Sequence, residues 1–153
     1  MRTQRKLITE QLDKKIRPFI GTQNVVIPDV GWIYSIRTTL NMTLEQLGKK
    51  LNITKQGAKQ IEHREVSGSL SLKSLKEIGE ALEMKFVYGF VPYNGSIENL
   101  VDVKATALAK KIVMRTNQNM KLENQGNSNE TIENAIKDLA QEIKREMNKS
   151  LWD

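Results

Sequence analysis

Two short helical patterns, "TLEQLGKKL" and "KQGAKQIEHRE", lie only three residues apart in the chain. In the first pattern, leucines recur at helical spacing after Thr43, a residue type favoured at helix N-caps. The second pattern begins after a similar cap, Thr54, and turns the small residue Ala58 inward. Two helices joined by so short a turn cross at a steep angle. The spacing therefore predicts a helix-turn-helix whose second helix protrudes.

The outer face of that second helix is polar, and every side chain on it can donate hydrogen bonds. These side chains are Lys55, Gln56, Lys59 and Gln60. A helix fits the major groove of DNA, where Gln pairs with adenine and Lys with guanine. We expect these residues to contact bases; an ordinary solvated helix surface is the alternative.

The net charge of the chain favours a polyanionic partner. The 153 residues carry a formal charge of +6, which attracts nucleic acid or an acidic membrane surface. No stretch approaches the roughly 18 apolar residues of a membrane span, and the first residues do not resemble a signal peptide. We therefore expect double-stranded DNA as the partner and no membrane association.

Residue types that carry catalysis are scarce. The chain has no cysteine and one histidine, His63, which excludes disulfides, thiol catalysis and zinc sites with cysteine ligands. It also lacks a Gly-rich phosphate loop and a cluster of metal ligands. We expect no enzyme activity, no cofactor and no metal. The absence of cysteine suits a reducing cytoplasm, where we expect the protein to act.

Other patterns flank the central pair. They predict helices at about residues 3–17, 32–40, 71–82, 97–114 and 130–149, with a polar linker at 115–130. The second of these places Trp32 in the core. Residues 86–91, "FVYGFV", are rich in β-formers and precede Pro92, so we expect one short strand. Because a lone strand leaves its backbone unpaired, it would pair with residues 25–27 or with the same strand of a second copy.

The sequence leaves more than one role possible for each of the two terminal helices. The helix at 3–17 is basic and could track DNA, face solvent or pack at a dimer interface. The helix at 130–149 has an apolar stripe, which would pack on its own core or on a partner.

The segment "LNMTLEQLGKKLNITKQGAKQIEHRE" resembles the helix-turn-helix of the phage-repressor family, also called Cro/CI or XRE. Together with "GWIYSIRTT", "SLKSLKEIGEALEMKFVYGFVP" and "MKLENQ", it resembles the family called mobile mystery protein A over about residues 5–150. Members of that family are helix-turn-helix regulators encoded beside a Fic-domain partner, mobile mystery protein B. Such pairs are similar to toxin–antitoxin modules, so the resemblance implies an antitoxin and autorepressor with a Fic-domain partner.

The resemblance also implies roles for single residues. Lys55, Gln56 and Gln60 match positions that contact bases in repressors of this type. Phage repressors often clamp a phosphate with Gln at the first residue of their second helix, where this chain has Leu44; Gln46 is the nearest substitute. The chain also lacks the Ser/Thr-x-x-x-Glu-Gly/Asn pattern of Fic inhibitors, so the resemblance favours transcriptional regulation over direct inhibition.

The expected phosphate contacts combine helix starts, basic residues and positions implied by the resemblance. They are Thr43, Gln46, Thr54, His63, Arg64, Ser67 and Ser71. Three glutamates, at positions 45, 62 and 65, weaken a phosphate-binding surface, and we expect Glu62 to pair with Arg37.

We therefore expect a mainly α fold: a phage-repressor-like helix-turn-helix bundle with one short β-strand and flanking N- and C-terminal helices. The expected domains are an N-terminal basic helix and connector (1–28), a DNA-binding domain (29–84) and a dimerisation or partner-binding region (85–153). The expected function is sequence-specific regulation of transcription by a homodimer on a palindromic operator. The alternative is a protein-binding antitoxin module that acts on its partner without specific DNA binding.

Overall fold

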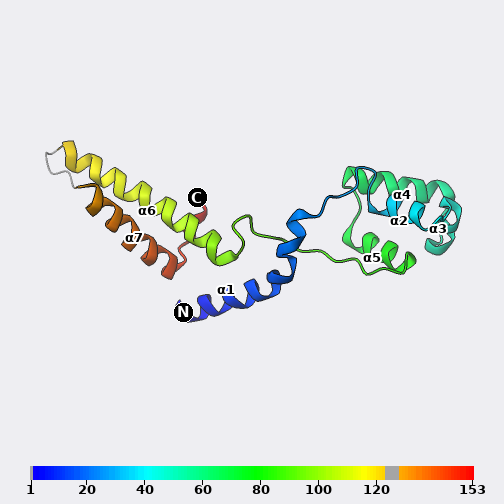
Figure 1. The fold of residues 1–153 in the computed structure, drawn as a ribbon, viewed down its shortest axis with the longest axis horizontal. Helices are drawn as coiled ribbons and strands as arrows, with labels where there is room; N and C mark the ends of the chain where they lie inside the picture. The colour runs from blue at the N-terminus through cyan, green and yellow to red at the C-terminus, as the bar shows by residue number, and fades with distance from the viewer. Residues whose placement is uncertain (1, 123–127) are drawn as a thin grey trace. The chain divides into compact units, whose positions relative to one another are not determined.

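The computed structural model describes residues 2–122 and 128–153. The chain divides into a central unit, Asn24–Tyr88, and a terminal unit made of Met1–Gln23 and Gly89–Asp153 (Figure 1). Among the described residues the fold is mainly α-helical, as the sequence predicts. The predicted DNA-binding region, 29–84, lies inside the central unit.

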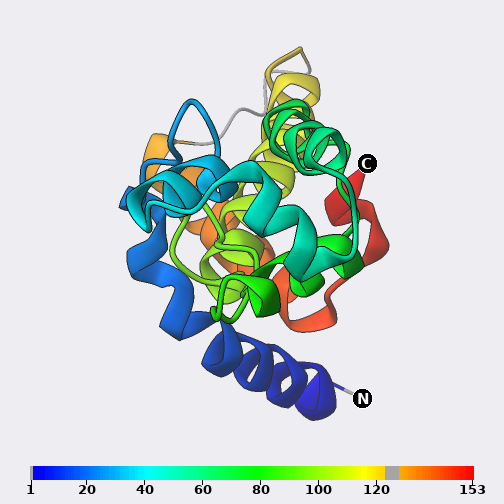
Figure 2. The same ribbon diagram turned by 90° about the vertical axis from the view of Figure 1, so that its right-hand side faces the viewer.

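The central unit contains four helices: α2 (Trp32–Thr39), α3 (Leu44–Leu51), α4 (Lys55–Ser67) and α5 (Leu72–Ala81). Figure 2 turns these short helices, coloured from cyan to green, toward the viewer. Thr43, Thr54 and Ser71 cap α3, α4 and α5, each accepting a hydrogen bond from a backbone N–H three residues on. The predicted N-caps Thr43 and Thr54 are thus confirmed, and Ser71 caps the helix that was predicted to begin there.

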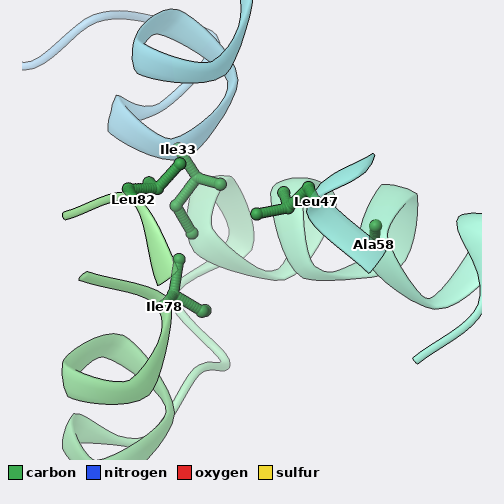
Figure 3. Packing of buried hydrophobic residues seen from close by; sticks show 5 residues of the cluster. All are labelled: Ile33, Leu47, Ala58, Ile78 and Leu82. Carbon is green, nitrogen blue, oxygen red and sulfur yellow. The ribbon is translucent and has the colours of Figure 1, made fainter. Parts of the chain in front are cut away.

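The core of the central unit takes side chains from all four helices. Figure 3 shows its buried members, Ile33, Leu47, Ala58, Ile78 and Leu82. Leu47 of α3 and Ala58 of α4 are both 0% exposed. Because alanine has the smallest side chain that still favours a helix, Ala58 lets α4 pack closely without a loss of helix propensity.

Helix α2 is rotated from the predicted orientation. Trp32 is 43% exposed and Leu40 is 51% exposed, so the prediction that Trp32 lies in the core is wrong. The buried residues of α2 are Ile33 and Arg37. Polar contacts of α2 with α4 fix this rotation, and the pattern of apolar residues in the sequence does not reveal those contacts.

The terminal unit contains α1 (Arg2–Ile16), the 3₁₀ segment η1 (Arg17–Asn24), α6 (Ile97–Leu122), α7 (Asn129–Glu146) and a short 3₁₀ segment, η2 (Lys149–Trp152). Helices α6 and α7 lie side by side (Figure 1) around buried Val101, Ala105 and Ile143. The Asp13 carboxylate of α1 caps α6 by accepting from the N–H of Ile97 at 2.7 Å. No helix among the described residues is both long and apolar enough to cross a membrane.

Two predictions of secondary structure are wrong. Residues 86–91 and 25–27 form no strand, because neither stretch finds a backbone hydrogen-bonding partner among the described residues. Helix α6 continues to Leu122, past its predicted end at residue 114, because the polar residues that follow include no Gly or Pro to stop it. The rest of the predicted linker includes residues 123–127, which lie outside the described residues.

Candidate nucleic-acid interface

Helix α4 has opposite inner and outer faces. Its inner residues, Ala58, Ile61, Glu62 and Glu65, follow helical spacing and are buried or half-buried. Its outer face presents the predicted base-contacting residues. The inner contacts therefore decide which side chains α4 turns to solvent.

One of these inner contacts is an ion pair between α2 and α4. The Arg37 guanidinium donates to the Glu62 carboxylate from Nε at 2.5 Å and from Nη2 at 3.2 Å, and from Nη1 to the Met42 carbonyl at 2.8 Å. Both residues are less than 10% exposed. The hydrogen bond to Glu62 raises the pKa of Arg37 above its ordinary value, although burial acts in the opposite direction. The predicted pairing of Glu62 with Arg37 is confirmed.

A second carboxylate of α4 caps α2. Glu65 accepts hydrogen bonds from the N–H groups of Trp32 and Ile33, both at 2.8 Å. A negative charge at a helix N-terminus complements the free N–H groups and the helix dipole. The carboxylate lies so close to Gly31, where φ is +87°, that a Cβ there would stand 2.9 Å from Glu65 Oε1. Glu62 and Glu65 thus fix α4 to α2 over one helical turn.

The turn between α3 and α4 depends on close backbone packing. Asn52 adopts the left-handed conformation, with φ of +56°, and the N–H of Ile53 donates to the Gly48 carbonyl at 2.9 Å. A Cβ on Gly48 would lie 2.8 Å from the Ile53 carbonyl oxygen. Glycine at position 48 is therefore needed for this short connection. Ile53 itself is 38% exposed, so it covers the turn and does not enter the core.

The four predicted base-contacting residues occupy the first two turns of α4. Lys55, Gln56, Lys59 and Gln60 are all exposed. Within the described parts of the chain, none of the four makes a side-chain hydrogen bond or ion pair. Their amide and ammonium groups are therefore available to a ligand.

Thr43 and Gln46 form a capping box at the start of α3. The Thr43 hydroxyl accepts from the N–H of Gln46 at 3.0 Å, and Gln46 Oε1 accepts from the N–H of Thr43 at 2.9 Å. Since the box uses only the oxygen of the amide, the Gln46 NH₂ group stays exposed as a donor. This geometry suits the phosphate contact predicted for Gln46.

Arg64 and Ser67 belong to one hydrogen-bonded turn at the end of α4. Arg64 Nη2 donates to the Ser69 carbonyl at 2.9 Å, and the Ser67 hydroxyl donates to the Arg64 carbonyl at 3.2 Å. Gly68, with φ of +77°, ends the helix in the left-handed conformation. His63 is exposed on the same face of α4 as Gln56 and Gln60. The guanidinium of Arg64 is thus held in place while most of its donors face solvent.

The remaining predicted phosphate contacts are the caps of α4 and α5. The Thr54 hydroxyl accepts from the N–H of Gly57 at 3.0 Å and keeps its own proton for donation. The Ser71 hydroxyl accepts from the N–H of Ser74 and donates to the Ser74 hydroxyl at 3.0 Å. Because Ser71 uses its proton within the chain, the free backbone N–H groups of α5 are the better phosphate donors there.

The structure adds two residues that the sequence interpretation missed, and it shows that two glutamates interfere less with phosphate binding than expected. Ser69 anchors Arg64, and no sequence signal marked it. Lys73 is exposed at the second residue of α5, where its position after a cap could have identified it as a phosphate contact. Three glutamates were expected to weaken phosphate binding. Two of them, Glu62 and Glu65, point inward, where Glu62 pairs with Arg37 and Glu65 caps α2.

No family model, curated protein or solved structure matches the chain.

Proposed function

We propose that this protein is a sequence-specific DNA-binding regulator of transcription with a phage-repressor-like helix-turn-helix, in which α3 and α4 are the two helices and α4 enters the major groove. The observation that carries the proposal is the outer face of α4. Its Lys and Gln side chains lie within the first two turns, are exposed, and have no partner among the described residues. Those turns reach base edges when a recognition helix docks.

The surroundings of α4 support the same function. Donors for phosphate lie at the start of α3 (Gln46), at the end of α4 (Arg64) and at the start of α5 (Lys73). Contacts of this kind hold a protein on the duplex without reading its sequence. A palindromic operator would bind two copies, with half-sites about 34 Å apart along the helix axis. The resemblance to mobile mystery protein A favours an autorepressor and antitoxin beside a Fic-domain partner.

Selection from a pool of random duplexes tests this proposal. The wild-type chain should enrich a palindromic motif. Gln56→Ala or Gln60→Ala should lose preference at one or two base pairs, with about 5- to 150-fold weaker binding to the wild-type motif. Gln118→Ala, a matched change at an exposed position of α6, should behave as wild type. An unchanged motif in both α4 variants would remove the reading role of α4.

Arg64→Ala separates phosphate binding from base reading. It should weaken binding to all sequences alike and reduce the salt dependence, because it removes one phosphate contact. The enriched motif should stay the same.

A second candidate function is protein binding through the terminal unit. Helices α1, α6 and α7 line an open groove of about 690 Å³. Its basic members include Arg5, Lys6 and Arg145, and its floor includes Val101. A partner protein with an acidic amphipathic segment would fit such a groove. This alternative would be favoured if the protein bound a partner protein tightly but showed no binding to DNA.

A further inference from the structure

Most of the net positive charge of the chain lies in its first 23 residues. Residues 1–23 hold six basic and two acidic side chains, a net charge of +4, whereas residues 24–153 hold 18 basic and 16 acidic side chains, a net charge of +2. The central unit, Asn24–Tyr88, holds nine basic and seven acidic side chains. Because phosphate contacts supply much of the affinity for a duplex, the unit that contains α4 has little net charge for this purpose.

Three of the cations in the terminal unit lie within four residues, at the junction of α1 and η1. The α1 basic cluster consists of Lys14, Lys15 and Arg17. All three side chains are exposed, and among the residues that the structure describes none of them forms a hydrogen bond or an ion pair. The neighbouring acid, Asp13, is used inside the unit, because its carboxylate accepts from the N–H groups of Ile97 and Glu98 at 2.7 and 3.2 Å. The cluster therefore keeps its charge for a ligand.

Contacts on both sides of the cluster hold this segment in the terminal unit. The ring of Phe19 lies so close to Gly89 that a Cβ there would stand 3.1 Å from it. The Gln23 amide donates to the Pro92 carbonyl at 3.0 Å. Ile16 and Phe19 are half-buried. Since its neighbours pack inward, the cluster presents its three cations to solvent from a fixed backbone.

We propose that the α1 basic cluster binds phosphates of the duplex that α4 reads, and so supplies affinity that does not depend on sequence. The inference rests on the proposed function for the identity of that duplex. Duplex DNA carries one negative charge per about 1.7 Å of its axis. A helix rises about 5 Å from residue 14 to residue 17, so about three phosphate charges lie along the cluster. Contacts of this kind position a protein on DNA without reading bases.

An acidic membrane surface suits α1 less well than DNA does. A helix that lies on a membrane separates a continuous apolar face from its charged face. Residues seven apart lie on the same side of a helix. In α1 the exposed Leu7 therefore shares its side with Lys14, and the exposed Ile8 shares its side with Lys15. Apolar and basic side chains mixed in this way leave no face that could enter a bilayer.

The salt dependence of DNA binding tests the cluster. Replacing all three cations with Gln removes three charges and keeps the helix propensity of the lysines. If each cation neutralises one phosphate, the slope of log K against log salt falls by about 0.9 for each, or about 2.7 in the triple variant. Between about 50 mM and 200 mM salt, the wild type should then lose about 40-fold more affinity than the triple variant. Selected and random duplexes should be affected alike.

The control removes the same charge from another helix of the unit. Lys104→Gln, Lys110→Gln and Lys111→Gln together change three exposed lysines of α6 and should keep the wild-type slope. If the α1 triple variant misfolds, the single variants replace it, each with a slope lower by about 0.9.

Three results would overturn the proposal. The first is a wild-type slope in the α1 variants, and the second is an equal fall in the α6 variant, which would show only an effect of net charge. The third is loss of binding to vesicles of anionic phospholipid in the α1 variants while their DNA slope is unchanged. If the wild type selects a motif but the α1 variants keep its slope, this inference alone fails. If random duplexes bind through the cluster but no motif is selected, the proposed function alone fails.

Discussion

Replacing Glu62 with Gln tests whether the Arg37–Glu62 ion pair fixes α4 on α2. Gln keeps the size of the side chain but removes the charge that balances the buried Arg37. Removing one partner of a buried pair costs about 3–5 kcal/mol. Arg37 keeps the Met42 carbonyl as an acceptor at 2.8 Å, so we expect a loss near the lower limit, about 3 kcal/mol.

A loss of this size is large for the central unit. A unit of about 65 residues has a total unfolding free energy of roughly 3–10 kcal/mol. Urea unfolding of Glu62→Gln should therefore begin at much lower urea concentration. The two tryptophans lie in different units, Trp32 in the central one and Trp152 in the terminal one. In a Trp152→Phe background, fluorescence reports on the central unit alone.

The control for Glu62→Gln replaces both partners. A chain carrying Arg37→Met and Glu62→Met should regain most of the lost stability, because apolar residues can substitute for a buried pair with little or no cost. Two results would refute the reasoning: a loss below about 1 kcal/mol in Glu62→Gln, or a double variant that is as unstable as the single one.

Three further changes test other contacts. Gly48→Ala should lower the unfolding free energy in urea by about 1–3 kcal/mol through overpacking against backbone atoms. Gly57→Ala should cost less, because its new Cβ would meet only side-chain atoms, the Thr54 hydroxyl at 3.3 Å and the Ile53 side chain at 3.4 and 3.5 Å; equal losses of unfolding free energy would argue against the close turn. Glu65→Ala should cost about 0.5–2 kcal/mol through loss of the α2 cap, and an unchanged thermal midpoint would mean that the cap contributes nothing. Lys144→Met should cost about 0.5–1 kcal/mol at pH 7. Hydrogen bonds to Asp102, and then Glu98, raise the pKa of Lys144 above 10.5. The stability that Lys144 contributes is therefore complete below pH 10.5 and is lost as the pH rises through the raised pKa. A difference in unfolding free energy between wild type and Lys144→Met that does not shrink in alkaline urea titrations would contradict this.

The helices of the central unit follow from local sequence signals. Thr43, Thr54 and Ser71 mark helix starts because a hydroxyl before an apolar pattern meets the free N–H groups of the first turn. The outer face of α4 was equally predictable, since four polar residues in two turns leave the inner positions to Ala58 and its neighbours. These are features of short range, and neighbours along the chain determine them.

Features that depend on distant residues were not predictable in the same way. The rotation of α2 is set by Glu62 and Glu65, more than 20 residues away. The Arg37–Glu62 pair was predicted, but the cap that Glu65 provides was not, and the apolar stripe at Trp32 indicates the wrong face of the helix. Strand formation failed as a prediction because β-propensity at residues 86–91 describes side-chain preference, whereas a strand also needs a backbone partner. Helix α6 is longer than predicted because a polar composition alone does not end a helix.

Binding of wild type and Gln56→Ala to single-base-pair variants of the selected duplex tests the central claim, that α4 reads bases, most directly. If Gln56 reads a base, changing one base pair and its symmetry mate should cost the two proteins different amounts of binding free energy. The difference, a coupling free energy, should be about 1–3 kcal/mol. At all other base pairs the two proteins should lose equal amounts of binding free energy. Equal losses at every position would show that Gln56 touches no base edge and would contradict the account.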